Sequence, residues 1–203
     1  SGLDFIPCND FSLYDGMLDT AVLVNAVPSG YRLLGLDQTD TAFAMARGYQ
    51  GKKGDVKALP MKKWFNTNYH YIVPLLENDM ELKLNSDLLL AQYSEALAAG
   101  IKTVPVLIGP LTFLKLAQYP GTKKLEDFTA DMAAVYADAL EALNAGGVEW
   151  LQMDEPVLAT DLTTRDVVIF CRIYADLLKS KGSTRVLLQT YFGDIRDCYK
   201  IGR

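Results

Sequence analysis

The sequence predicts an α/β fold, more specifically a partial (β/α)8 barrel of parallel strands with helices outside. Helical patterns alternate with short, nearly continuous apolar segments, which are typical of parallel strands buried on both faces. Polar residues directly follow several of these segments, as expected at the carboxyl ends of barrel strands. A complete barrel takes ~250 residues. With 203 residues, the chain is expected to lack strands at both ends.

A doubly wound parallel sheet is the alternative architecture for the same alternation. That fold usually carries a glycine-rich phosphate-binding turn after its first strand, either GxGxxG or GxxxxGK[ST]. Neither motif occurs in the sequence. We therefore favour the partial barrel and expect residues 1–203 to form a single partial amino-terminal barrel domain.

The first predicted strand, Leu3 to Pro7, leads into a helix. Asn9 and Asp10 are favourable capping residues, and apolar residues follow at helical spacing. From about residue 27 to residue 60, prolines and glycines break the chain around one helical segment near Thr39 to Ala46. We interpret this part as an irregular excursion outside the main scaffold.

Beyond the excursion the alternation becomes regular, because glycines end each helical pattern just before an apolar segment. The predicted elements are an extended segment from Tyr69 to Val73, a helix from Ser86 to Ala98, a strand from Ile101 to Ile108, a turn at residues 109–112 that exposes the Thr112 hydroxyl, a helix from about Leu125 to Ala145, a strand from Val148 to Met153, a helix from Thr164 to Lys181 and a strand from Arg185 to Tyr191.

The overall charge and the cysteines narrow the function classes. A net charge of −5 argues against a nucleic-acid partner, and the one basic cluster, at residues 52–63, indicates either a local anion site or a solvated loop. No apolar stretch approaches the ~20 residues that span a bilayer, and no leader opens the chain, so a soluble cytoplasmic protein is expected. Cys8, Cys171 and Cys198 lack CxxC spacing and are expected to be reduced.

The segment Met61 to Tyr71 combines two lysines, four aromatic rings, two asparagines and the single histidine of the chain. Rings offer apolar faces, carboxamides offer donors and acceptors, and an ammonium offers a charge for a carboxylate or phosphate. This mixture predicts a surface that holds an aromatic, anionic ligand. The alternative is that the rings belong to the core and the lysines are solvated.

A second candidate is the pair Asp154 and Glu155, which follows a predicted strand. Adjacent side chains at a strand end point in opposite directions, so at most one of them faces the barrel mouth. Asp154 could hold a substrate ammonium or accept a proton; the alternative is that both carboxylates cap the next segment. His70 could act as a base, but without a recognisable nucleophile we favour a hydrogen-bonded histidine in the pocket wall.

Four separated motifs resemble the amino-terminal half of the cobalamin-independent methionine synthase family. In chain order they are Asn9–Asp15 (NDFSLYD), Lys63–Tyr71 (KWFNTNYHY), Leu107–Thr112 (LIGPLT) and Glu149–Pro156 (EWLQMDEP). The resemblance covers almost the whole chain. It implies the amino-terminal one of two barrels, in a methyltransferase of methionine biosynthesis that moves a methyl group from 5-methyltetrahydrofolate polyglutamate to homocysteine.

In that family zinc activates the homocysteine thiolate in the carboxyl-terminal barrel, while the amino-terminal barrel helps to hold the folate and its glutamate tail. The resemblance thus implies two partners, the folate polyglutamate and the catalytic barrel of the same chain. The counterparts of a His-x-Cys zinc pair are Leu188 and Thr190, so no metal or other cofactor is expected in this fragment, and zinc belongs to the absent half. A basic segment of the family would precede Ser1, so weak folate binding is expected.

The resemblance assigns roles to individual residues. Lys63 lies where the family places a lysine that contacts the folate, and Trp64, Asn66, Tyr69 and His70 are expected to shape the surrounding wall. Asp154 corresponds, through the duplication, to an aspartate that holds homocysteine in the catalytic half, and here it is expected to be a structural relic. No catalytic residue is expected in this chain.

Three hypotheses therefore remain from the sequence. The leading one is a non-catalytic, folate-binding fragment of a methionine synthase. The second is a stand-alone folate-binding or scaffold domain descended from that half. The third is a different barrel enzyme, such as a decarboxylase acting on an anionic ring system, which would require complete strands and a basic pocket.

Overall fold

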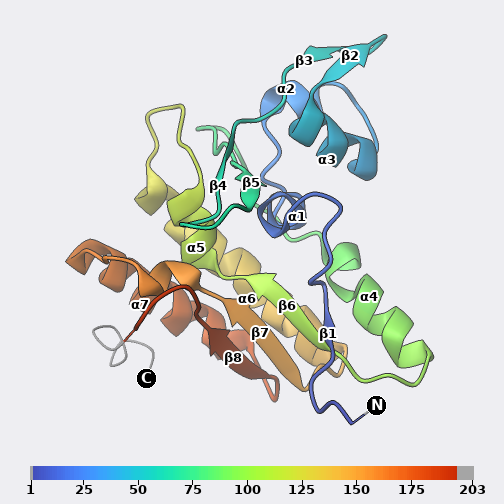
Figure 1. Cartoon of the computed structure of the whole chain (residues 1–203), viewed down its shortest axis with the longest axis vertical. Coiled ribbons are helices and arrows are strands. Elements are labelled where there is room, and N and C mark those ends of the chain that lie inside the picture. The colour runs from blue at the N-terminus through green and yellow to red at the C-terminus, as the bar shows by residue number, and fades with distance from the viewer. Residues whose placement is uncertain (1, 196–203) are drawn as a thin grey trace.

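The computed structural model describes residues 2–195, and its centre is a four-stranded parallel sheet (Figure 1). The strands lie in the order β1 (Pro7–Cys8), β6 (Val104–Ile108), β7 (Trp150–Asp154) and β8 (Arg185–Gln189). Each neighbouring pair is parallel. The predicted α/β class with parallel strands is confirmed. Within the described residues β1 and β8 are edge strands, as expected of an incomplete barrel.

Helices and two small hairpins complete the described part of the chain. The helices are α1 (Gly16–Leu23), α2 (Ser29–Arg32), α3 (Gln38–Arg47), α4 (Ser86–Ala98), α5 (Pro110–Leu116), α6 (Thr129–Ala145) and α7 (Thr164–Leu177), with 3-10 turns at Leu125–Phe128, Pro156–Ala159 and Leu178–Ser180. The antiparallel hairpins pair β2 (Tyr49–Gly51) with β3 (Gly54–Val56) and β4 (Met61–Lys63) with β5 (His70–Ile72). Residues 29–56 lie apart from the four-stranded sheet in Figure 1.

The longest helices form because their sequences bury one face and cap their ends. Helix α7 begins with a capping box, in which the Thr163 side chain accepts from the Asp166 N–H and Asp166 accepts from the Thr163 N–H. Helix α6 packs beside α7 and buries Met132, Tyr136 and Leu140. The core thus joins α6 and α7 to the buried strand β7.

The start of the first helix differs from the prediction. Helix α1 begins at Gly16 and is capped by Asp15, whereas Asn9 and Asp10 precede it in a loop. Asn9 has a left-handed φ of 59° and is tied to α4, since its N–H donates to the Gln92 side chain over 2.7 Å. The preceding strand is also shorter than predicted, because only Pro7–Cys8 pairs with β6.

The predicted turn after β6 is instead helix α5, with Pro110 at its first position, where a missing N–H costs no hydrogen bond. The Thr112 hydroxyl, predicted to be exposed, is completely buried. Elsewhere the helices and strands lie close to the predicted bounds. The segment Tyr69 to Val73 is extended as predicted, and its central residues form β5 in a separate hairpin.

Two further predictions concern the chain as a whole. No helix within residues 2–195 has both the length and the apolar character needed to cross a membrane. Cys8 and Cys171 are free thiols, as predicted, and Cys198 lies outside the described residues.

Candidate functional site

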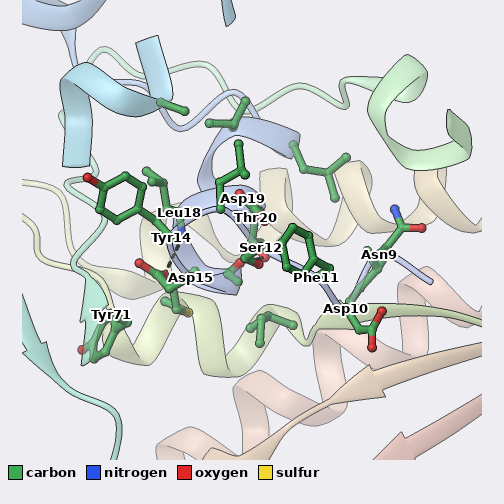
Figure 2. Close-up of a pocket in the computed structure, with 18 of the residues that line it drawn as sticks. Asn9, Asp10, Phe11, Ser12, Tyr14, Asp15, Leu18, Asp19, Thr20 and Tyr71 are labelled. Carbon is green, nitrogen blue, oxygen red and sulfur yellow. Dashed lines mark hydrogen bonds between the residues drawn. The ribbon is translucent and has the colours of Figure 1, made fainter. Parts of the chain in front are cut away.

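A cavity of about 650 Å³ lies where the parallel strands end. Its lining includes the residues that follow β1, the last residues of β6 and β7, and Tyr191 beyond β8. The other walls come from α1, α3, α4 and the β4–β5 hairpin, and Figure 2 shows the residues between β1 and α1 running through the site. The carboxyl edge of a parallel sheet is where ligands bind in such folds.

The residues between β4 and β5 form a compact turn beside this cavity. The Trp64 N–H donates to the Tyr69 carbonyl over 2.7 Å, and the Thr67 hydroxyl donates to the Trp64 carbonyl over 2.7 Å. Phe65 adopts a left-handed φ of 51°, which reverses the chain within this turn. The turn therefore holds the aromatic run in a fixed shape beside the cavity.

The structure separates the predicted site residues of this run. Trp64, Tyr69 and His70 line the cavity. Lys63 lies opposite His70 in the hairpin and is exposed, and Asn66 is exposed in the turn; neither is part of the cavity lining. Lys63 therefore lies on β4, the strand of this hairpin that does not line the cavity.

The two interpretations of the aromatic run each hold for some of its rings. Tyr71 is 4% exposed, and its hydroxyl donates to the Leu116 carbonyl over 3.1 Å. Trp64 is half-buried, with edge-to-face contacts to Phe65 and Tyr71 at centroid distances of 5.0 and 5.6 Å. Tyr69 is 77% exposed. The run is core at Tyr71 and surface at Tyr69.

Asp15, which the sequence interpretation missed, joins this hairpin to α1. Its Oδ1 accepts from the Leu18 N–H and its Oδ2 from the Ile72 N–H, both over 2.9 Å. Burial raises the pKa of Asp15, and the hydrogen bonds from Ile72 and Leu18 act in the opposite direction. The available signal was that Asp15 is itself a preferred helix cap just before Met17 and Leu18, whereas the sequence prediction began the helical pattern at Leu13.

Asp154 is the last residue of β7, is half-buried and lines the cavity. Gln152 Nε2 donates to its Oδ1 over 2.9 Å. Burial raises the pKa of Asp154, against hydrogen bonds with Gln152 and Tyr191. Burial also raises the pKa of Tyr191, as does the charge of Asp154, while a hydrogen bond with Trp64 lowers it. Tyr191 lines the cavity with Asp154 and reaches the aromatic run through Phe192, whose ring contacts both Tyr191 and Phe65.

Glu155 points away from the cavity into the protein, as predicted for adjacent residues of a strand end. Its carboxylate accepts from the Leu111 N–H over 2.9 Å, from the Thr112 N–H over 2.7 Å and hydroxyl over 2.5 Å, and from the Tyr174 hydroxyl over 3.0 Å. Burial raises its pKa to about 7, although hydrogen bonds from Thr112 and Leu111 oppose that rise. Glu155 therefore caps α5 and links it to α7.

The charge of the cavity is negative. Among the described residues, its lining has four carboxylates and no lysine or arginine, and His70 is its one other titratable side chain besides the tyrosines. The carboxylates belong to Asp10, Asp15, Asp19 and Asp154. The cavity lining therefore offers no lysine or arginine to an anion, and it does not provide the basic pocket that the decarboxylase hypothesis requires.

The two positions that the resemblance matches to a zinc-binding pair carry unsuitable side chains. Leu188 has no donor atom, and the Thr190 hydroxyl is not one of the usual ligands of zinc. Across residues 2–195 no three histidine, cysteine or acidic side chains form a group that could hold a metal ion. These residues do not fit the zinc site of the catalytic half.

Comparison with known proteins identifies what this chain resembles. A family model described as "Cobalamin-independent synthase, N-terminal domain" matches residues 1–202. Curated relatives from Bifidobacterium longum (strain NCC 2705) and Lactococcus lactis subsp. lactis (strain IL1403) are 53% and 48% identical, and each alignment covers 98% of this chain. Both are named 5-methyltetrahydropteroyltriglutamate–homocysteine methyltransferase. The chain spans 27% and 26% of their lengths.

Proposed function

Because the chain belongs to the cobalamin-independent synthase family as part of its N-terminal domain, we propose that it contributes folate binding, without catalysis, to a cytoplasmic methionine synthase. The whole enzyme would transfer a methyl group from 5-methyltetrahydrofolate polyglutamate to homocysteine, as the names of its relatives indicate for those proteins. The observation that carries the proposal is the match of the family model over residues 1–202. The partners would be the folate and the remaining part of the same polypeptide.

Lys63 is the proposed contact for the glutamate tail. It lies on β4 beside Lys62, is exposed, and is paired across the hairpin with His70 at the cavity wall. An exposed ammonium can reach a carboxylate without the desolvation that burial would require. The acidic cavity would repel the tail, so the tail is expected to follow β4 outside it. Trp64, Asn66, Tyr69 and His70 would shape the adjacent surface.

The lack of catalysis is proposed from the residues that would have to perform it. Leu188 and Thr190 offer no zinc-binding pair, and His70 has no hydrogen-bonded nucleophile among the contacts of the described chain. Incubation of the 203-residue chain with zinc, homocysteine and methylfolate triglutamate should therefore form no methionine. Methionine formation above a protein-free control would contradict this part of the proposal.

The folate role can be tested in a full-length enzyme that contains this chain. Lys63→Ala should weaken binding of the triglutamyl folate by roughly tenfold, the size of one lost charge-assisted contact, and should affect the monoglutamyl folate less. Lys102→Ala is the matched control, because Lys102 is exposed and lies just before the amino-terminal end of β6, whereas the cavity lies at the carboxyl ends of the strands. Equal weakening for both folates would remove the tail contact.

The second hypothesis, a stand-alone binding or scaffold domain, makes a different prediction about the gene. A catalytic domain downstream of Arg203 supports the enzyme, whereas an early stop codon supports the stand-alone domain. Because the relatives are almost four times as long as this chain, we favour the enzyme.

A further inference from the structure

The cavity has a charge imbalance that the proposed function does not use. None of its four carboxylates forms an ion pair with a described residue. Both oxygens of Asp15 are occupied by backbone N–H groups, but Asp10, Asp19 and Asp154 keep acceptor capacity, because an ionised carboxylate has about four acceptor positions. The cavity thus presents negative charge without a compensating protein cation.

Partial desolvation of these carboxylates strengthens their attraction to a nearby cation. Asp154 is half-buried and burial raises its pKa; Asp19 is more exposed, and its pKa is shifted in the same direction by partial desolvation, against a hydrogen bond with Ser12. A charge that has lost part of its hydration interacts more strongly with an opposite charge nearby, because the local dielectric constant is lower than that of water. A cation entering the cavity would relieve this cost.

Aromatic rings stand around the same space. Trp64 and Tyr191 line the cavity together with Asp154, and Tyr14 packs edge-to-face on Phe43 on the wall near α3, at a centroid distance of 5.8 Å. In Figure 2, Tyr14 and Tyr71 lie on either side of Asp15. Ring faces attract cations and also cover apolar groups, which an inorganic ion does not carry. The volume of about 650 Å³ falls within the ~300–1,000 Å³ of small-molecule sites.

We propose that this cavity binds a small organic cation, an ammonium that carries an apolar arm, with Asp154 and Asp19 as its charge partners and Trp64 and Tyr191 among the rings that contact it. A metal ion is disfavoured, because the carboxylates do not gather into a group that could ligate one within the described residues. This site lies inside the cavity, whereas the proposed folate-tail contact lies on β4. The two proposals share the wall residue Trp64 but differ in their charged partners, so variants of Lys63 test the folate contact and variants of Asp154 and Asp19 test the cation site.

Trp64 supplies a direct probe. The chain has two tryptophans, and Trp150 lies at the start of β7, the opposite end of that strand from Asp154, with contacts to Phe5 and Arg185. In a Trp150→Phe background, titration with butylammonium should change the Trp64 fluorescence and reach saturation. Butanol and butyrate, which have the same arm without the positive charge, should bind at least tenfold more weakly. An equal response to butanol would overturn the proposal.

Variants in the same background locate the site. Asp154→Asn should weaken butylammonium binding by about tenfold, and Asp19→Asn by several-fold. The Asp19 variant changes a surface-accessible residue of α1, so it remains informative if Asp154→Asn disturbs folding, which circular dichroism would reveal. Asp176→Asn, at the far end of α7, is the matched control and should bind as the parent does. Unchanged binding by folded Asp19→Asn and Asp154→Asn variants would refute the assignment.

Discussion

Glu155 offers a test of the balance between burial and hydrogen bonding. The carboxylate is completely buried, has no cationic partner among the described residues and accepts four hydrogen bonds. Burial raises its pKa from 4.5 to about 7 in the folded protein. Between these values the folded state binds more protons than the unfolded state. The contribution to stability is therefore fully present below pH 4.5 and is lost as the pH rises through about 7.

The perturbation is Glu155→Gln, which cannot titrate. Subtracting the unfolding free energy of the variant from that of the parent removes, to first order, the titration of all other groups. From the two pKa values, this difference should fall by about 2 kcal/mol between about pH 5.5 and about pH 8. Urea denaturation followed by tryptophan fluorescence at both pH values measures it.

The sign of the change decides between the two effects. If the four donors hold Glu155 ionised, its folded pKa lies below 4.5, and the difference would instead be constant from about pH 5.5 upward. A constant or rising difference would therefore refute the dominance of burial. Asp176→Asn is the control: the hydrogen bond from Lys179 lowers the pKa of Asp176, so the corresponding difference should stay constant from about pH 5.5 upward.

Three further predictions follow from local geometry. Gly109→Ala should lower the free energy of unfolding by roughly 2–4 kcal/mol, because a Cβ there would lie 2.2 Å from Glu155 Cδ. Gly16→Ala is the control: its Cβ would lie 3.5 Å from Ile108, and the free energy of unfolding should change by less than ~1 kcal/mol. Urea denaturation of both variants measures the difference. Asp15→Ala should cost roughly 2 kcal/mol, because it removes a helix cap and the acceptor of a strand N–H, and hydrogen exchange should rise at the α1 amino terminus; unchanged exchange would contradict this. The third, Lys63→Ala with its mono- and triglutamyl comparison, is set out above.

Local sequence patterns predicted much of the scaffold, because the spacing of apolar residues and the position of glycines directly determine where helices and strands form and end. Helical spacing and terminal glycines placed α4, α6 and α7, and continuous apolar segments placed β6, β7 and β8 in parallel. The pattern failed where a distant residue decides the local structure. Helix α5 looked like a turn because Gly109 and Pro110 break helices, yet the N–H groups of its first turn are satisfied by Glu155, 44 and 43 residues away.

The same distinction applies to the candidate site. Composition alone singled out the run at residues 61–71 and the pair Asp154 and Glu155, and the strand-end rule placed only the pair at the carboxyl ends of the strands. Composition could not show that Tyr191 would line the same cavity as both, nor that Lys63 would lie outside the cavity lined by His70. Those relations depend on how a hairpin folds back onto a sheet, which the spacing of residues in the sequence does not encode.

At the end of β7, adjacent side chains point in opposite directions and have different roles, one toward the cavity and one in the protein interior. Asp154 faces the cavity, where its charge is available to a ligand, while Glu155 faces inward and caps α5. Because Gly109 leaves no room for a Cβ beside Glu155, α5 packs directly onto the carboxylate and fixes the end of β7. Replacing Glu155 should therefore change the unfolding free energy, because Glu155 holds α5 against the end of β7. Replacing Asp154 should change binding of the proposed cation and leave the contacts between Glu155 and α5 intact.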